Sequence, residues 1–175
     1  MTQKEVRFPG HINKWRFIPE GLDYDRYVVF SDTDDVVFQK SLPEFTYDLY
    51  LAPENVPHRE TIWAAQIEKY PAFSELMDKD VFNCGTFAMK VKTMYEYQEF
   101  LMTFEDGGYR KLGLEQMYFN LFVHRRRDLS RVIDLNIFAP LFRNYNDGWV
   151  KKDGVWKANK TISCAHANGC HKELL

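Results

Sequence analysis

The chain has 175 residues, a formal net charge of −2, and 45% hydrophobic and 16% aromatic residues. This length suggests one domain spanning residues 1–175, which can bury roughly 70% of the surface that the unfolded chain exposes. The composition argues against intrinsic disorder, and the small net charge indicates no particular class of partner.

Targeting signals and basic surfaces are weak in this sequence. No apolar run reaches the ~18 residues of a membrane-spanning helix, and the start, MTQKEVRFPGH, lacks the apolar core of a signal peptide. The one dense basic run, residues 124–127, is interpreted as a solvated helix end rather than a nucleic-acid-binding surface. We expect no transmembrane segment and no nucleic-acid partner.

The cysteine content indicates the compartment. Cys84, Cys164 and Cys170 form an odd, low count, which favours reduced thiols in a cytosol-like compartment. We therefore expect a cytoplasmic protein, with a Cys164–Cys170 disulfide as an open alternative.

The first half of the chain mixes helix and strand patterns. The consecutive apolar residues Val28, Val29 and Phe30 predict a strand buried on both faces, as in a parallel sheet. In chain order we predict a helix over 11–22, strands over 26–31, 36–39 and 45–51, a loop over 53–57, and a helix over 60–69.

The second half continues this alternation. We predict a strand over 85–91, helices over 92–105 and 114–124, a short strand at 132–133, a hairpin over 148–157, and a last strand over 161–165. Strands alternating with helices predict a three-layer α/β/α domain.

Three carboxylates, Asp32, Asp34 and Asp35, lie between two apolar runs in RYVVFSDTDDVVFQ. Two unit charges ~4 Å apart repel by roughly 4 kcal/mol at an effective dielectric constant near 20, so water, a raised pKa or a cation must offset the repulsion. Ligands of open α/β sheets bind beyond the carboxyl ends of the strands, and Mg²⁺ or Mn²⁺ prefers carboxylate and phosphate oxygens. The pattern predicts a divalent cation held with a substrate diphosphate; the alternative is an acidic turn in water.

The stretch FSDTDDVVF resembles the signature of GT-A-fold glycosyltransferases, in which a hydrophobic strand precedes an Asp-x-Asp or Asp-x-x-Asp motif and a second short strand. Three further stretches follow in that family's order: VFNCGTFAM, GLEQMYFN and ISCAHANG. Together they extend from about Trp15 to Gly169. The resemblance implies a Rossmann-like α/β/α fold with a mixed central sheet.

The resemblance also implies roles for individual residues. Metal ligands are expected among the three aspartates and the late histidine: Asp32, Asp34, Asp35 and His166. Groups that bind the sugar nucleotide are expected at Lys14, Asp32, Asp34, Asn83, Gly85, Asn168 and Gly169. Catalytic groups near the transferred sugar are expected at Glu115 and Gln116.

The resemblance therefore implies a glycosyltransferase that depends on Mn²⁺ or Mg²⁺. The donor would be a UDP- or GDP-linked sugar, and the acceptor a glycan, a protein or a lipid. The cation would stabilise the diphosphate leaving group as a Lewis acid. A carboxylate at Glu115 would serve as general base in an inverting enzyme or steady an oxocarbenium-like state in a retaining one.

The sequence departs from the family pattern in two places. Only about thirty residues precede Asp32, so we expect the opening βαβ unit that grips the nucleotide base to be absent or shortened, which leaves a minimal GT-A domain. Leu114 stands where the family usually has an acidic residue, so Glu115 is a single carboxylate rather than one of a pair.

Other interpretations remain open. In a haloacid-dehalogenase-type phosphatase, Asp32 would be the nucleophile and Asp34 the acid, with Lys90 and Asp134 as partners. A domain that binds a nucleotide sugar without turnover is a second alternative. A zinc site within residues 164–171 is disfavoured because its four ligands are compressed into eight residues. The tryptophans that could stack on an acceptor sugar or pack in the core are Trp63, Trp149 and Trp156.

Overall fold

The computed structural model describes residues 21–32, 35–104, 114–141, 150–158, 160 and 162–167. Over these residues the protein is a mixed α/β structure whose sheets combine antiparallel and parallel pairs. Its helical segments are η2 (His58–Glu60), α1 (Ala64–Lys69), η3 (Pro71–Leu76), α2 (Val91–Met102) and α3 (Glu115–Arg125). None of the helices in this part of the chain has the length and apolar character needed to cross a membrane.

The main sheet has the strand order β1-β4-β3-β5. Its strands are β1 (Tyr27–Ser31), β4 (Asp80–Lys90), β3 (Leu49–Pro57) and β5 (Arg131–Ile133). The two long strands, β3 and β4, pair antiparallel in the middle of the sheet, β1 pairs antiparallel with β4, and β5 pairs parallel with β3. The sheet is therefore mixed, as expected.

A second, small sheet has the order β2-β9-β6. It contains β2 (Val36–Phe38), β9 (Cys164–Ala167) and β6 (Phe138–Leu141). The hairpin of β7 (Val150–Lys152) and β8 (Val155–Lys157) turns through Asp153 and Gly154, whose φ angles of 53° and 76° are typical of a two-residue hairpin turn.

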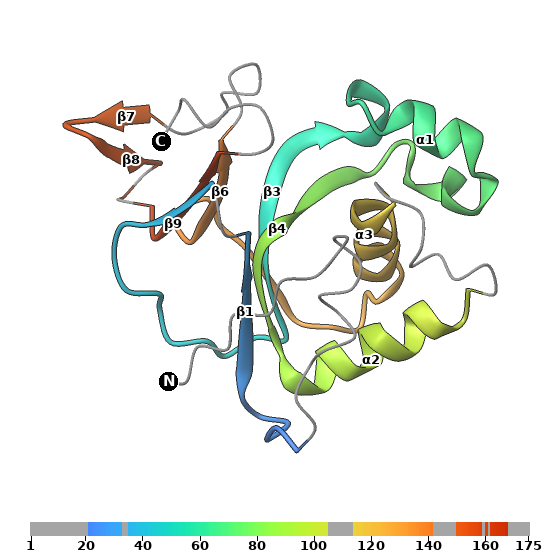
Figure 1. The fold of residues 1–175 in the computed structure, drawn as a ribbon, viewed down its shortest axis with the longest axis horizontal. Helices are drawn as coiled ribbons and strands as arrows, with labels where there is room; N and C mark the ends of the chain where they lie inside the picture. Colours follow the sequence, from blue (N-terminus) through green and yellow to red (C-terminus); the bar gives the residue numbers. More distant parts are fainter. Residues whose placement is uncertain are drawn as a thin grey trace.

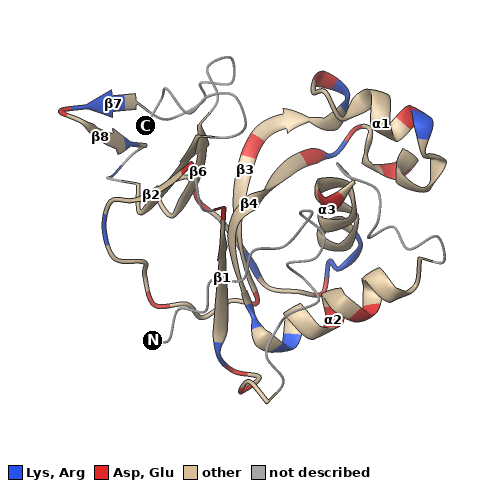
Figure 2. Cartoon of the chain, in the orientation of Figure 1, with Lys and Arg blue, Asp and Glu red and all other residues tan. Residues whose placement is uncertain are grey.

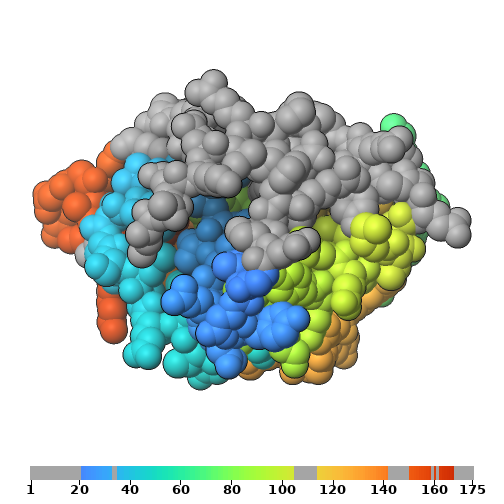
Figure 3. Space-filling view, turned by 60° about the horizontal axis from the view of Figure 1, so that its bottom comes forward, coloured from blue at the N-terminus to red at the C-terminus, as the bar shows by residue number. Residues whose placement is uncertain are grey.

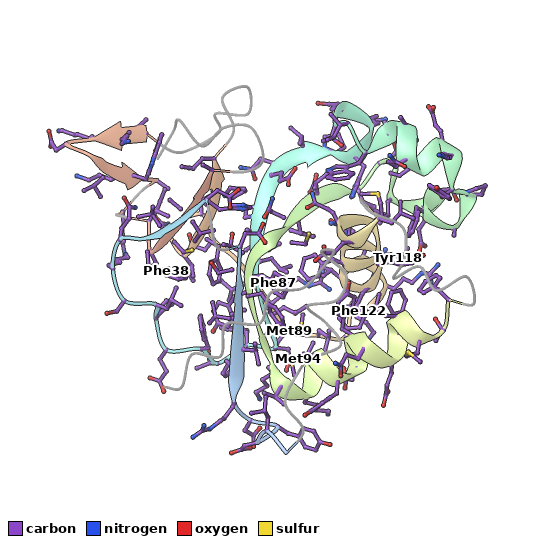
Figure 4. The ribbon with its side chains drawn as sticks, viewed as in Figure 1. Phe38, Phe87, Met89, Met94, Tyr118 and Phe122 are labelled. Carbon is purple, nitrogen blue, oxygen red and sulfur yellow. The ribbon has the colours of Figure 1, made fainter. Side chains whose placement is uncertain are left out.

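The helices lie on one face of the main sheet and the small sheet lies on the other (Figure 1). Side chains alternate along β4, so Phe87 and Met89 point toward the helices, where Met94, Tyr118 and Phe122 also lie (Figure 4). Within the described residues the opposite face is covered by the small sheet, so a second helical layer is not seen there.

The space between the two sheets forms a second core. It contains Tyr50 and Ala52 of β3, Ala88 of β4, Phe138 of β6 and Cys164 of β9. Because the main sheet has a core on each side, β1 packs with both of its faces, as its apolar sequence predicts. The expected parallel pairing of β1 is wrong, since β1 is an antiparallel edge strand.

Aromatic contacts fix β1 at that edge. In the face shown in Figure 3, the segment around β1 (blue) lies between the segment that follows β2 (cyan) and α2 (yellow-green). Tyr24 contacts Tyr95 of α2 with ring centroids 5.7 Å apart, and Tyr27 contacts Phe45 at 5.3 Å. These contacts hold the strand that leads into the acidic stretch.

Most predicted elements are confirmed, with shifted ends: the strands at 26–31, 36–39, 85–91 and 132–133, the helices at 92–105 and 114–124, and the hairpin. The strand predicted over 161–165 overlaps β9 only at residues 164–165. The helix predicted over 60–69 is divided into η2 and the shorter α1, and the strand predicted over 45–51 begins only at Leu49. β6 was not predicted, and residues 11–20 of the first predicted helix lie outside the described residues.

The loop predicted over 53–57 is wrong, because these residues form the second half of β3. Proline disfavours a strand because it cannot donate a ladder hydrogen bond. Pro53, however, lies beyond the residues that pair with β5, which are 49–51, so its missing N–H removes no hydrogen bond from that ladder. Register irregularities on the β4 side accommodate the rest of the segment.

Candidate metal site

Three side chains from distant parts of the chain meet where the two sheets adjoin. Asp32 directly follows β1, Asp35 directly precedes β2, and His166 lies in β9. One ligand atom from each lies within 4.8 Å of the others. His166 Nε2 is 3.5 Å from Asp32 Oδ2 and 3.4 Å from Asp35 Oδ1. The acidic end of β1 is visible in Figure 2.

Backbone hydrogen bonds from both sheets hold the three residues in place. The N–H of Asp32 donates to the carbonyl of Gly85 in β4 at 2.8 Å. The N–H of Ala167 in β9 donates to the carbonyl of Asp35 at 2.8 Å, and Val36 stands opposite His166 in the β2–β9 ladder. Asp32 is thus fixed to the main sheet, whereas Asp35 and His166 are fixed to the small sheet.

Gly85 forms the floor of this cluster. A Cβ at this position would lie 2.6 Å from Asp32 Oδ2 and 2.9 Å from His166 Nδ1, and still closer to His166 Cε1. Real Cβ atoms do not approach other atoms so closely. The glycine is therefore required by the close approach of β4 to the two side chains, not by an unusual backbone angle.

Hydrogen bonds define which nitrogen of His166 carries the proton. Asn83 Oδ1 accepts from the N–H of Gly85 at 2.8 Å, while Asn83 Nδ2 donates to Glu54 Oε1 at 3.0 Å. This orientation of the amide makes Oδ1 an acceptor toward His166 Nδ1, 3.1 Å away, so Nδ1 is the donor. An imidazole that is neutral and protonated at Nδ1 presents its Nε2 lone pair to Asp32 and Asp35.

The resulting arrangement suits a cation. His166 Nε2 lies 3.5 Å from one carboxylate oxygen and 3.4 Å from the other, and this grouping is unfavourable unless a proton or a metal ion lies among them. Asp35 is buried, and its Oδ1 accepts no hydrogen bond from the part of the chain that the structure describes. Carboxylate oxygens with one imidazole nitrogen are a donor set for Mn²⁺, Mg²⁺ or a related divalent ion.

A buried polar network borders the cluster. Glu54 Oε1 accepts from Asn83 Nδ2 and also from Gln116 Nε2, each at 3.0 Å. Gln116 Oε1 accepts from the N–H of Cys84 at 3.3 Å. Burial raises the pKa of Glu54, and the two amide hydrogen bonds only partly oppose that shift.

The sequence-predicted residues fall into three groups. The structure brings together Asp32, Asp35, His166, Asn83 and Gly85, and Gln116 joins them through Glu54. Glu115 is buried in the first turn of α3, and its role near the sugar stays a prediction. Outside the described residues lie Lys14, Asp34, Asn168 and Gly169.

Glu54 was missed by sequence reasoning. The segment PENVP, residues 53–57, was interpreted as a loop, where a glutamate is unremarkable. The available signal was a single carboxylate separated from the apolar run YLA only by Pro53, because a charged group close to a buried strand requires partners.

The alternative uses of the cysteines and tryptophans find little support. Cys164 is a free thiol, so the Cys164–Cys170 disulfide is not formed, and burial raises the pKa of Cys164 to about 12. A buried thiol of this kind is a poor zinc ligand, because the metal binds the thiolate. Trp156 packs in the small core beside β6 and β9 and Trp63 packs against the helical core, whereas Trp149 lies outside the described residues.

No protein-family model matches this chain, and no curated protein or solved structure gives a match to it.

Proposed function

We propose that this domain is a divalent-metal-dependent glycosyltransferase of the GT-A type, which takes a sugar from a nucleoside-diphosphate sugar. The observation that carries the proposal is the convergence of Asp32, Asp35 and His166 at the junction of the two sheets. These residues belong to two separate sequence motifs more than 130 positions apart, and they meet as the resemblance implies.

Charge explains why a diphosphate would need the metal here. Asp32 and Asp35 together carry two negative charges and would repel an anionic diphosphate. A bound Mn²⁺ or Mg²⁺ ion supplies Lewis-acid stabilisation of the diphosphate leaving group. Asp32, Asp35 and His166 would hold that ion, and with its two positive charges the site no longer repels the substrate.

The structure favours a modified role for Asn83. The sequence predicts that Asn83 contacts the donor directly, but it is only 1% exposed and its side-chain oxygen already lies close to Gly85 N–H and His166 Nδ1. In this proposal Asn83 orients His166. The same reasoning applies to Gln116, which is 5% exposed and bonded through both amide atoms to Glu54 and Cys84. In this proposal Glu115 at the start of α3 stays the candidate beside the donor sugar, and the diphosphate is left to Lys14, Asn168 and Gly169.

The phosphatase alternative fits the geometry less well. It requires Asp134 and Lys90 near Asp32. Asp134 follows β5, which is three strands away from β1, a separation of about 14 Å at the usual strand spacing. Lys90 stands opposite Tyr27, at the end of β1 remote from Asp32, and it pairs with Asp25.

The proposal is tested by calorimetric titration of the full chain with UDP and with GDP, each with and without Mn²⁺. Binding that requires Mn²⁺ is expected in the wild type and lost in Asp32→Asn and Asp35→Asn. Asp78→Asn, which removes an exposed carboxylate paired with Arg59, is the control that should bind normally. Metal-dependent binding that survives in both site variants would overturn the ligand set.

A second measurement separates an enzyme from a domain that only binds. Slow hydrolysis of the preferred sugar nucleotide, dependent on Mn²⁺ and abolished in Asp35→Asn, is expected of a glycosyltransferase supplied with water in place of its acceptor. Tight binding with no turnover, with water or with glycan, protein or lipid acceptors, would instead identify a non-catalytic nucleotide-sugar-binding domain.

A further inference from the structure

We propose that Glu54 is a positioning residue for the candidate metal site, which fixes the tautomer of His166 through the amide of Asn83. The inference rests on the proposed function, since it assigns His166 Nε2 to the metal. It concerns a residue that lies outside the sequence motifs and does not contact the cluster of Asp32, Asp35 and His166 in any described hydrogen bond.

The first step is the position of Glu54 in β3. Its side chain is 5% exposed, and the hydrogen bonds described for it both go to Oε1, from Asn83 and from Gln116. A buried carboxylate with two neutral amide donors costs free energy compared with an apolar residue of the same size. A buried carboxylate is therefore expected where its oxygen orients neighbouring hydrogen-bond donors.

The second step is the effect on Asn83. An asparagine amide can be turned by 180° with little change in shape, and the turn exchanges its donor and acceptor. Turning Asn83 would direct its carbonyl oxygen at the Glu54 carboxylate and its NH₂ group at the N–H of Gly85. Glu54 and Gly85 therefore favour the same orientation, with Oδ1 toward His166.

The third step is the effect on His166. With Asn83 Oδ1 as the acceptor, His166 Nδ1 must carry the proton and Nε2 is left as the metal-binding atom. Partners that orient a ligating histidine in this way typically change metal affinity by about 10- to 100-fold when they are removed. Asn83 is the direct partner of His166, and Glu54 would act on His166 indirectly, through Asn83.

The network also connects this arrangement to α3. Gln116 donates to the same oxygen of Glu54 and accepts from Cys84, the residue between Asn83 and Gly85. A displacement of α3 would thus change the hydrogen bonds of Gln116 to Glu54 and to the backbone of β4. The connection links the candidate sugar-binding end of α3 to the histidine of the metal site.

The first test compares two replacements of Glu54 in the full chain. Glu54→Gln keeps an oxygen that can accept both amide hydrogens, whereas Glu54→Met has a similar length and offers only a weakly accepting thioether sulfur. We expect Mn²⁺ affinity within about threefold of wild type for Glu54→Gln and about 10- to 100-fold weaker for Glu54→Met. Equal affinity in wild type and Glu54→Met would overturn the proposal.

The second test reads the tautomer directly, without metal. Nitrogen-15 NMR, recorded at an alkaline pH at which the imidazole is neutral, distinguishes the Nδ1-protonated from the Nε2-protonated form, and the His166 signals are those absent from His166→Asn. We expect the Nδ1-protonated form in wild type and in Glu54→Gln, and a mixture or the other form in Glu54→Met. An Nε2-protonated wild type would overturn the proposal even if Mn²⁺ binds.

A third test applies if Glu54→Met does not fold, and it exchanges the carboxylate and the amide between positions 54 and 83. Asn83→Asp alone places two carboxylates about 3 Å apart and should weaken Mn²⁺ binding by about 10-fold or more. Adding Glu54→Gln lets the new amide donate to the carboxylate at position 83, which can still accept from His166 Nδ1 and from the N–H of Gly85, although the hydrogen bond from Gln116 Nε2 to position 54 is lost. The double variant should recover part of the affinity, and no recovery would argue against the relay.

Asn120→Leu is the matched control for loss of a buried amide network. Asn120 bonds to the backbone of Phe82 and to the backbone carbonyl of Gln116, but not to the side chains of Glu54, Asn83 or His166. It should lower the melting temperature while leaving the His166 tautomer and the Mn²⁺ affinity unchanged; a tautomer change in this variant would mean that Glu54 acts only through general stability. If wild type fails to bind Mn²⁺, the proposed function fails, and the tautomer comparison still decides the role of Glu54.

Discussion

Gly85 shows at the scale of one residue how closely the backbone of β4 approaches the candidate ligands. An added methyl group would meet both His166 and Asp32. Either the two side chains move apart or β4 moves away, and each change separates the groups that are expected to hold the metal. The space for a side chain at this position is therefore a direct probe of the site.

We predict that Gly85→Ala lowers Mn²⁺ affinity by at least about 10-fold and costs about 1–3 kcal/mol of stability through overpacking. Isothermal titration and urea unfolding measure the two effects. Gly154→Ala is the control, because its φ of +76° makes alanine unfavourable by about 1 kcal/mol while nothing lies within 4 Å of the new Cβ. Gly154→Ala should lose stability and keep the metal, so normal Mn²⁺ binding in Gly85→Ala would contradict the site geometry.

His58 provides a second prediction at the residue scale. It is fully buried, donates from Nδ1 to the carbonyl of Lys79 at 2.8 Å, and has no partner for Nε2 among the described residues. Burial lowers the pKa of His58, and burial likewise lowers that of His124 nearby. In the unfolded chain the histidine pKa is near 6.5. The unfolded chain therefore becomes protonated at these histidines at a higher pH than the folded protein does.

This difference makes the protein less stable as the pH falls below about 6.5, because the unfolded state gains protons first. The loss continues until the pH reaches the lowered pKa of the folded state. We predict that His58→Asn, which keeps a donor for Lys79, reduces the slope of unfolding free energy between pH 7 and pH 5 by up to about 1 kcal/mol per pH unit. Urea unfolding at several pH values measures the slope; identical slopes would show that His58 does not titrate on unfolding.

At the scale of elements, side chains of α3 supply hydrogen bonds to the backbone of β4 in the part of β4 that does not pair with β1. The β1–β4 ladder ends at the pair Ser31 and Thr86. Beyond it, Asn120 accepts from the N–H of Phe82 at 2.7 Å and donates to its carbonyl at 2.8 Å, while Gln116 accepts from the N–H of Cys84. Gln116 and Asn120 lie four residues apart on one face of α3, so two side-chain amides replace a neighbouring strand.

We predict that Asn120→Leu destabilises the protein by about 3 kcal/mol, because it leaves both backbone groups of Phe82 buried without partners, at about 1–3 kcal/mol each. Urea unfolding at pH 7 measures the change. Arg125→Ala on the exposed side of the same helix removes only a surface ion pair with Glu75 and should cost less than about 1 kcal/mol. A similar small loss in Asn120→Leu would mean that water reaches Phe82.

These contacts explain which elements could be predicted from the sequence. Val28, Val29 and Phe30 indicate a strand with two packed faces because their hydrophobicity is local information, and the amphipathic pattern of α2 is equally local. The pairing direction of β1 depends on β4, more than fifty residues away, and no local pattern contains it. From the sequence alone, Pro53 indicates a loop. Only the structure shows that Pro53 lies outside residues 49–51, which pair with β5, so that a strand is possible there.

The same distinction applies to the candidate site at the scale of the whole molecule. Asp32, Asp35 and His166 were predicted because the ligand types occur in recognisable stretches, and the fold brings these three together. Glu54 could not be predicted, because its importance comes from tertiary hydrogen bonds to Asn83 and Gln116. Local patterns therefore indicate the ligands, whereas the groups that orient them depend on the packed structure.

The whole molecule is divided by the core between the two sheets, and the candidate site spans that division. Asp32 is bonded to the main sheet through Gly85, and Asp35 and His166 belong to the small sheet. An ion bound by all three would connect the sheets at one end, in addition to the apolar contacts of Tyr50, Ala88 and Phe138. Separating the sheets would then require release of the ion.

We therefore predict that Mn²⁺ slows hydrogen exchange most strongly in β2 and β9, where opening of the small sheet exposes the ladder that holds Asp35 and His166. At a Mn²⁺ concentration about 100 times the dissociation constant, the gain for an opening that releases the ion is about 2.7 kcal/mol, or about 100-fold in exchange rate. Mass spectrometry of peptides covering 36–38 and 162–167 measures it, with α1 as an internal reference and Asp35→Asn as the variant that should show no gain. An equal rise in protection in α1 would mean that the metal acts by slowing global unfolding. No gain in protection in β9 would mean that His166 does not hold the ion.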